Sequence, residues 1–331
     1  KKFEEKYKEL QPEKYKDTIE HVIKKGNTPA GMHISIMVNE ILNFLKIQPG
    51  ETGFDATLGY GGHTKAMLQC LKGQGHIYAT DVDPEESART RKRLEEAGFG
   101  EDILTIRLQN FCTIDEIAKE AGGFDFILAD LGVSSMQIDN PKRGFSFKVD
   151  GPLDLRLNQE AGISAAERLA AITKDELAGM LYENSDEPYC EELAKAITDE
   201  IRKGNRIDTT TKLRNIIEKT LDFLPEKEKK DTIKKTCQRT FQALRIDVNR
   251  EFEVLYEFME KLPDALKPGG RAAILTFHSG EDKLVKKALK EGYRAGIYAD
   301  YAKDVIRPSA QECAQNGRAR STKMRWAIKA E

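Results

Sequence analysis

The feature that most constrains the fold is a glycine-rich run, Asp55-Ala56-Thr57-Leu58-Gly59-Tyr60-Gly61-Gly62-His63, followed by the acidic step Asp81-Val82-Asp83-Pro84. An apolar segment over 52–57 precedes the glycines, a helical pattern follows them, and a second apolar segment over 76–82 ends in the acids. Strand, tight turn, helix and strand in this order are typical of a parallel α/β sheet. The run therefore predicts a doubly wound, Rossmann-like sheet, in which ligands bind beyond the carboxyl ends of the strands.

The same run indicates a nucleoside ligand. The glycines let the backbone approach a ligand closely, and an acid at the end of the next strand can accept hydrogen bonds from both ribose hydroxyls. Asp83, Pro84 and Glu86 have the pattern of a helix start, with Asp83 as the cap. Asp81 is therefore the predicted ribose ligand.

Two residues favour S-adenosylmethionine over a dinucleotide. Thr64 stands where the dinucleotide fingerprint has its third glycine, and the carboxylate of Asp55, just before the turn, would repel a pyrophosphate. S-adenosylmethionine has a ribose, an adenine, a sulfonium and an ammonium, but no phosphate. An NAD-dependent oxidoreductase on the same fold remains the alternative enzyme class.

Composition limits the other function classes. The chain has 331 residues, a hydrophobic content of 39% and a formal net charge of −2, so any nucleic-acid contact must come from local patches. The five cysteines form no C-x-x-C pair, which favours a reducing cytoplasm and no metal site. No apolar run approaches the length of a membrane span, and the first residues have no signal-peptide core.

The alternation of strands and helices continues through strands at 103–108 and 124–130 and then stops. Residues 132–235 have helical, charged patterns. They precede an expected long helix over 240–261, a strand over 271–278 and an edge strand over 322–328. The sequence therefore predicts an N-terminal extension over 1–32, a sheet domain over 33–131 and 236–331, and an inserted helical subdomain over 132–235.

Longer motifs resemble the MraW/RsmH family. They are Asp130–Asp139, Arg143–Phe147, Asp150–Arg156, Thr240–Asn249 and Phe277-His278-Ser279. Members of this family are S-adenosylmethionine-dependent methyltransferases that modify the exocyclic N4 of a cytidine in the decoding centre of 16S ribosomal RNA. The resemblance runs from about residue 33 to 329. It implies a class I methyltransferase fold, S-adenosylmethionine as cofactor, and ribosomal RNA of a small subunit as partner, with no DNA and no membrane. We also expect a cytoplasmic monomer or homodimer.

The resemblance carries over individual residues. The implied cofactor contacts, with Gly59 added from the loop itself, are Gly59, Gly61, Gly62, His63, Asp81, Phe111, Asp130 and Gln137. The candidate substrate contacts are Arg143, Phe145, Phe147, Arg156, Asn249, His278, Arg318 and Arg320. Asp130 is also the candidate catalytic residue, as an acceptor that orients the amine. The Pro-Pro-aromatic step of many amino methyltransferases does not follow it, so Phe145 or Phe147 is the candidate to stack on the base.

The sequence departs from the family pattern on the substrate side. Gly280 replaces a leucine in the usual Phe-His-Ser-Leu-Glu-Asp, and Tyr182-Glu183-Asn184-Ser185-Asp186-Glu187 replaces a tyrosine–glycine–acid–acid step. Two further alternatives therefore stay open. One is methylation of another RNA or of a protein amine, and the other is a non-catalytic ribosome assembly factor that retains the cofactor pocket.

Overall fold

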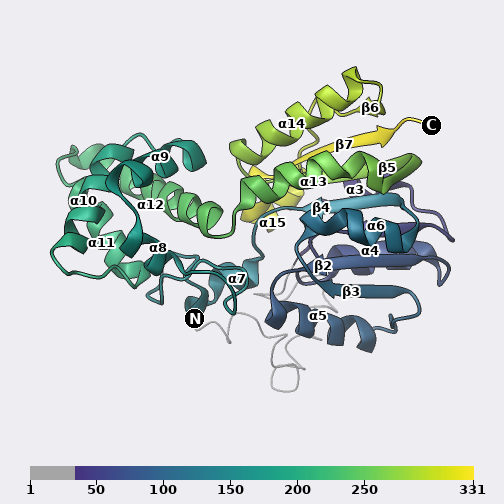
Figure 1. Cartoon of the computed structure of the whole chain (residues 1–331), viewed down its shortest axis with the longest axis horizontal. Helices are drawn as coiled ribbons and strands as arrows, with labels where there is room; N and C mark the ends of the chain where they lie inside the picture. Colours follow the sequence, from purple (N-terminus) through teal and green to yellow (C-terminus); the bar gives the residue numbers. More distant parts are fainter. Residues whose placement is uncertain (1–33) are drawn as a thin grey trace. The chain divides into compact units, whose positions relative to one another are not determined.

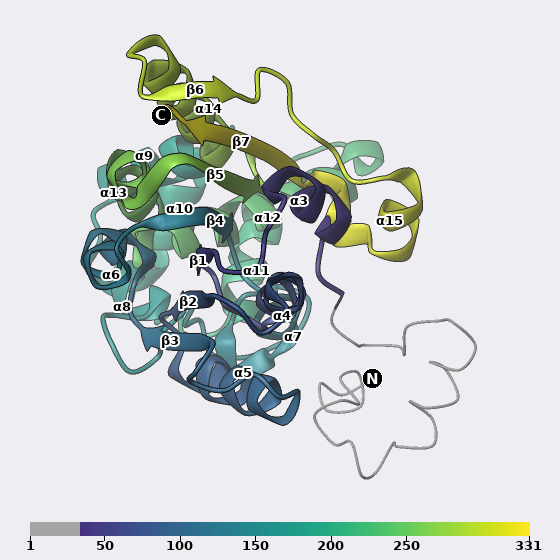
Figure 2. The same ribbon diagram turned by 90° about the vertical axis from the view of Figure 1, so that its right-hand side faces the viewer.

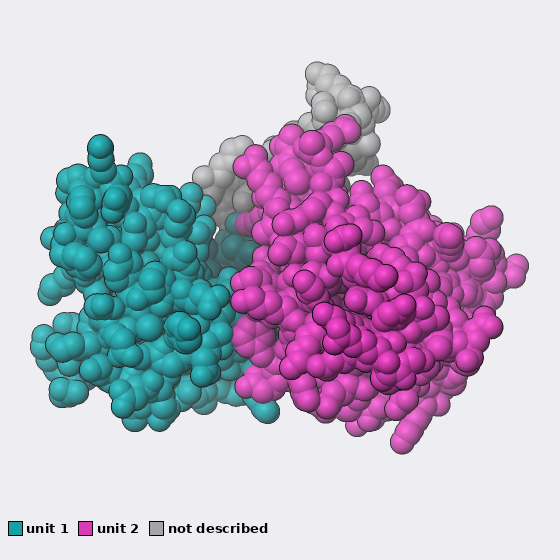
Figure 3. Space-filling view, turned by 90° about the horizontal axis from the view of Figure 1, so that it is seen from above, with its two compact units in different colours: residues 1–33, 133–251 teal, residues 34–132, 252–331 magenta. Residues whose placement is uncertain are grey.

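The structure is a computed structural model that describes residues 34–331. The predicted N-terminal extension, residues 1–32, lies outside the described residues. Among the described residues the chain forms two compact units, which Figure 3 colours separately. We call residues 34–132 and 252–331 the sheet unit and residues 133–251 the helical unit.

The sheet unit contains a seven-stranded sheet of order β3-β2-β1-β4-β5-β7-β6. The strands are β1 (Thr52–Asp55), β2 (His76–Asp81), β3 (Leu104–Leu108), β4 (Phe124–Asp130), β5 (Leu266–Thr276), β6 (Tyr298–Tyr301) and β7 (Lys323–Lys329). Strands β1 to β5 pair in parallel, whereas β7 pairs antiparallel with both β5 and β6. The predicted doubly wound α/β sheet is confirmed.

Helices cover both faces of this sheet (Figures 1 and 2). On one face pack α3 (Val38–Leu45), α4 (Gly62–Leu71) and α5 (Pro84–Glu96), and on the other α6 (Ile114–Ala121), α13 (Glu251–Ala265) and α14 (Ser279–Arg294). Each face has its own apolar core, because alternate residues of a strand point to opposite faces. In the described part of the chain no helix is both long and apolar enough to span a bilayer.

The strand order reverses at β1, because β2 and β4 lie on its two sides. Such a reversal is where open α/β sheets bind their ligands. The register of the pairs brings three strand ends to this edge, with Asp55 opposite Leu128 and Asp130 opposite Leu275. Asp81 ends the neighbouring strand opposite Leu108. The sheet thus gathers acidic side chains at one edge.

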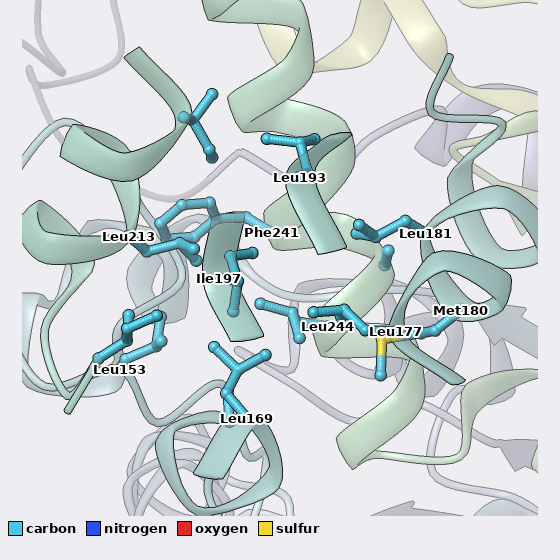
Figure 4. Close-up of a cluster of buried hydrophobic side chains, with 14 of the residues drawn as sticks. Leu153, Leu169, Leu177, Met180, Leu181, Leu193, Ile197, Leu213, Phe241 and Leu244 are labelled. Atoms are coloured by element: carbon cyan, nitrogen blue, oxygen red, sulfur yellow. The ribbon is translucent and has the colours of Figure 1, made fainter. Parts of the chain in front are cut away.

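The helical unit contains α7 (Ser135–Asp139), α8 (Ala165–Ala171), α9 (Lys174–Ser185), α10 (Cys190–Arg202), α11 (Thr210–Thr220) and α12 (Glu226–Val248). Its core is formed by apolar side chains, chiefly leucine and isoleucine, and all but the first of these helices contribute to it (Figure 4). Leu177, Leu193 and Leu213 are fully buried in it. The predicted end of the insertion, residue 235, falls within α12, whereas the two units separate after residue 251.

Two predicted elements are wrong in detail. The helix expected over 240–261 is two helices, α12 and α13, separated at Asn249 and Arg250. Arg250 adopts a left-handed φ of 49°, which ends a helix, yet no proline or glycine marks the break in the sequence. The expected edge strand over 322–328 is β7, which lies inside the sheet. The edge strand on that side of the sheet is β6, whose four residues are too few to show an alternating pattern.

Candidate functional site

Side chains of α5 contact the glycine-rich loop and fix its backbone. Gly59 and Gly61 have φ values of 51° and 87°, and a Cβ on Gly61 would lie 2.6 Å from the Cγ2 of Thr90. The Thr90 hydroxyl donates a hydrogen bond to the Gly59 carbonyl. Arg93 donates to the carbonyl of Tyr60 at 3.0 Å, and its guanidinium carbon lies 3.8 Å from the centre of the Tyr60 ring. Sequence reasoning missed Thr90 and Arg93, because nothing local to α5 indicates which loop it contacts.

Asp81 is oriented by two backbone N–H groups. Gly59 donates to one carboxylate oxygen at 2.9 Å and Asp83 donates to the other at 3.0 Å. Burial raises the pKa of Asp81 to about 6, so the group is ionised at neutral pH. Each oxygen keeps a further lone pair for a ligand hydroxyl. Asp83 caps α5 by accepting from the N–H groups of Glu85 and Glu86, which confirms the predicted cap.

Asp55 differs from its expected position at the ligand side. Its side chain is fully buried, and it accepts from the hydroxyl of Thr64 at 2.5 Å and from the N–H of Thr57 at 3.0 Å. Burial raises the pKa of Asp55. Thr64, at the position of the missing third glycine, therefore ties the start of α4 to the end of β1. Asp55 supports the loop internally.

His63 and Asp130 form a pair at the carboxyl end of β4. The Nδ1 of His63 lies 3.3 Å from an oxygen of Asp130, and its Nε2 lies 2.7 Å from the carbonyl oxygen of Ile36. Burial alone would lower the pKa of His63, but the hydrogen bond and charge of Asp130 raise it to about 9. The ring is therefore an imidazolium at neutral pH, with both N–H groups donating. The Asp130 side chain stays 27% exposed, so it can reach a ligand.

Phe111 lies in a short turn, η2 (Phe111–Thr113), after β3. Its ring meets the ring of Phe258 edge to face, with centroids 5.2 Å apart. The turn is anchored from α13 by Lys261, which donates to the carbonyl of Cys112 at 2.8 Å and pairs with Asp115 at 3.0 Å. Phe111 is thus a half-buried aromatic surface at the end of the sheet, suited to the flat face of a purine.

The predicted site residues of the helical unit already have partners within it. Gln137 forms a capping box with Ser134 at the start of α7. The buried Arg143 donates to the carbonyls of Arg156 and Leu157 at 3.4 and 2.6 Å. Arg156 pairs with Asp154 through two hydrogen bonds of 2.9 Å. These arginines therefore shape the loop over 143–162.

Asn249 and the two candidate stacking residues also make their contacts inside the helical unit. Asn249 accepts from the N–H of Leu157 at 2.9 Å and donates to the carbonyl of Leu155 at 2.8 Å, which ties the loop to the end of α12. Phe145 is buried in the core, and Phe147 packs on Phe241 with ring centroids 5.7 Å apart. The structure thus places both phenylalanines among core side chains.

The remaining candidates lie in the sheet unit. His278 caps α14 by accepting from the N–H of Glu281 at 3.4 Å, and its Nε2 lies 3.0 Å from a Glu281 oxygen. Arg318 and Arg320 belong to η4 (Gly317–Ser321), next to α15 (Ala310–Gln315). Arg320 is exposed and Arg318 is half-buried.

The sheet unit thus brings together two bonded pairs of predicted residues, Gly59 with Asp81 and His63 with Asp130. Their chemistry fits S-adenosylmethionine. A fixed carboxylate suits a ribose diol, the half-buried ring of Phe111 suits an adenine, and the partly exposed carboxylate of Asp130 suits a cationic group. Gln137 belongs to the helical unit.

Known proteins resemble the chain over its whole length. A profile of the MraW methylase family matches residues 30–330. The "Ribosomal RNA small subunit methyltransferase H 1" of Agathobacter rectalis is 87% identical over 331 residues, which are 100% of this chain and 95% of that protein. A protein of the same name from Lachnoclostridium phytofermentans is 71% identical and covers 100% of this chain and 90% of its own length. The "Ribosomal RNA small subunit methyltransferase H 2" of Acholeplasma laidlawii is 54% identical, over 94% of this chain and 90% of that protein.

These matches confirm the family resemblance found in the sequence motifs, and with it a methyltransferase that depends on S-adenosylmethionine. Because the family profile spans nearly the entire sequence, the chain belongs to the MraW methylase family.

Proposed function

We propose that this protein transfers a methyl group from S-adenosylmethionine to the exocyclic N4 amine of a cytidine in small-subunit ribosomal RNA, near the decoding centre. The names of its relatives support ribosomal RNA of the small subunit as the substrate. The motifs shared with the family support the N4 position. The observation that carries the proposal is the pairing of Asp130 with His63 at the ligand edge of the sheet.

The chemistry requires an acceptor beside the amine. The lone pair of a cytosine amine is delocalised into the ring, so the amine is a poor nucleophile until a neighbour orients it. The bound cofactor supplies an electrophilic methyl group on a sulfonium. Asp130 can accept a hydrogen bond from the amine, because His63 contacts one of its oxygens and the side chain remains partly exposed. His63 keeps that carboxylate in place and balances its charge.

The flat surface that stacks on the base comes, in this proposal, from Phe277, which directly follows β5. Gly132 follows Asp130 by two residues and has a φ of 97°, and the ring of Phe277 lies 3.9 Å from the position of a Cβ on Gly132. Phe145 is buried in the core of the helical unit, and the partly buried Phe147 packs there on Phe241, whereas the partly buried Phe277 lies beside Gly132. Phe277 therefore replaces them as our candidate for the aromatic step that the sequence lacks after Asp130.

The helical unit, in the same proposal, recognises the RNA around the target nucleotide, with Arg318 and Arg320 adding contacts to phosphates. The target base must leave its stack to reach the strand ends. Arg143, Arg156, Asn249 and Gln137 then act by shaping the loops of the helical unit that contact the RNA. A ribosomal substrate places the reaction in the cytoplasm, and we expect a monomer or homodimer.

The test is methylation of small ribosomal subunits that lack the modification. Purified protein is incubated with these subunits and labelled S-adenosylmethionine, and the nucleosides are analysed by mass spectrometry. N4-methylcytidine at one decoding-centre position is expected, and Asp130→Asn should lose most of the turnover. Cofactor binding without any methylated nucleoside would contradict the proposal and support another RNA, a protein amine or a non-catalytic role.

A further inference from the structure

One peptide group, between Ile36 and Met37, is bonded on both sides by residues far away in sequence. Its carbonyl oxygen lies 2.7 Å from the Nε2 of His63 in the cofactor loop. Its N–H donates to the Oε2 of Glu312, on α15, at 2.9 Å. Figure 2 shows α15 beside α3, whose first residues follow this peptide. The C-terminal helix is therefore connected to His63 through a single amide.

The orientation of this peptide is not the relaxed one. Met37 has φ and ψ of 57° and 34°, in the left-handed region, which costs a residue with a side chain about 1–2 kcal/mol. The Met37 side chain is fully buried in the core beneath α3, so its Cα cannot move away. Such a conformation persists only where its surroundings fix it. Here the surroundings are His63 on the carbonyl side and Glu312 on the N–H side.

Removal of the Glu312 carboxylate would leave the Met37 N–H without its acceptor and permit the peptide to rotate. Rotation would turn the Ile36 carbonyl away from His63, because the two groups belong to one rigid plane. His63 would lose one of the two hydrogen bonds that fix its ring. The other bond reaches Asp130, so a loosened ring would no longer hold that carboxylate in one position.

We propose that Glu312 is a positioning residue for methyl transfer, which holds Asp130 in place through the Ile36–Met37 peptide and His63. The inference rests on the proposed function, since it assigns a purpose to the placement of Asp130. Through Glu312, α15 thus has a role that is separate from RNA contact. Glu312 itself does not touch the reacting atoms in this proposal.

Two conservative variants separate the hydrogen bond from the charge. Glu312→Gln keeps the length of the side chain and a carbonyl acceptor but removes the charge. Glu312→Asp keeps an acidic side chain in the first turn of α15. Because this side chain is one methylene shorter, its carboxylate no longer reaches the N–H of Met37. Because Asp is favourable near a helix start, the second variant is expected to fold. Gln311→Ala, at an exposed position of the same helix, is the control.

The first readout does not require activity. The protein has five histidines, so the imidazole signal of His63 in carbon-13-labelled protein can be assigned by its loss in His63→Asn. We expect the titration midpoint of His63 to fall by about one pH unit in Glu312→Asp, and to stay near the wild-type value in Glu312→Gln and Gln311→Ala. Equal midpoints in all four proteins would overturn the inference, whether or not the protein methylates RNA.

The second readout is turnover on the small subunit. Glu312→Asp should reduce kcat by about tenfold to 100-fold, as expected when a reacting group is misplaced, with a smaller change in the KM for RNA. Glu312→Gln should retain most of the wild-type kcat. Similar losses in both variants would show that the charge of Glu312 matters, which contradicts the hydrogen-bonded connection. An inactive wild type with a shifted His63 titration in Glu312→Asp would reject the proposed function and leave the connection standing.

Discussion

The ring of Phe252, on α13, occupies the space that a side chain at Gly280, on α14, would need. A Cβ on Gly280 would lie 2.6 Å from the Cζ of Phe252 and 3.2 Å from the Nδ1 of His278. Phe252 also meets the His278 ring with centroids 5.8 Å apart. The glycine in place of the family leucine is therefore matched by an aromatic residue on the neighbouring helix.

This match predicts coupling between the two positions. Gly280→Leu should force the Phe252 ring out of its contact with His278, whereas the same change in a Phe252→Ala background should be tolerated. We expect an interaction free energy of about 0.5–3 kcal/mol in a double-mutant cycle measured by urea unfolding. Additive effects of the two changes would show that Phe252 moves freely and does not compensate for the glycine.

Asp81 should dominate the affinity for the cofactor. Asp81→Asn removes a charged acceptor from two ribose hydroxyls, so we expect binding to weaken by about 1.5–3 kcal/mol, or roughly 10- to 150-fold, in calorimetry with S-adenosylmethionine. Asp102→Asn, a change in the turn before β3, is the control. Because burial raises the pKa of Asp81 to about 6, wild-type affinity should also decline as the pH falls through 6. A flat pH profile would argue that the ribose is held elsewhere.

His63 should give the folded protein a stability that disappears in alkali. Its pKa is raised from 6.5 to about 9 in the folded state, so the folded state binds the proton more tightly than the unfolded state. The stabilisation is complete below pH 6.5 and is lost as the pH rises through 9. We expect the difference in thermal midpoint between wild type and His63→Gln to shrink between these pH values. A difference that is constant across this range would contradict the paired imidazolium.

We expect Asn249 to affect RNA binding only through the stability of the folded protein. Its side chain makes three hydrogen bonds, to the N–H of Leu157 and to the carbonyls of Leu155 and Arg245, at 2.8–2.9 Å. Asn249→Ala should lower the free energy of unfolding by about 2–3 kcal/mol. Asn205→Ala, which removes an exposed bond to Glu200, should change it by less than about 0.5 kcal/mol. Loss of RNA binding in a fully stable Asn249→Ala protein would restore the direct contact expected from the sequence.

Local rules in the sequence predicted those parts of the site that depend on neighbours along the chain. The cap role of Asp83 could be predicted because a helix cap is recognised from the next three residues. The internal role of Asp55 was missed because its partner, Thr64, lies nine residues further along the chain, and only the fold shows the bond between them. Thr90 and Arg93 were missed for the same reason, since their contacts with the loop cross about thirty residues.

The break between two helices and the edge of the sheet were harder to predict than the presence of the strands. The strands β1 to β5 have strong apolar runs, so their existence followed from the sequence. The break between α12 and α13 depends on the left-handed backbone of Arg250, a residue with no intrinsic preference for that conformation. The position of β7 inside the sheet depends on β6, whose short run resembles a loop. The helix break and the position of β7 both depend on tertiary interactions, and the hydrophobic periodicity of the sequence does not reveal these.

The order of the strands in space differs from their order of synthesis, and this affects how the nascent protein can fold. β4 leaves the ribosome before its partner β5 has been translated, because the residues of the helical unit are encoded between the two strands. The helical unit, a continuous stretch with its own core, can become compact during that interval. β5 then keeps one edge open until residues 323–329 emerge and pair with it. Removal of these seven residues should therefore leave a sheet that binds chaperones or aggregates through β5, while the helical unit folds unaffected.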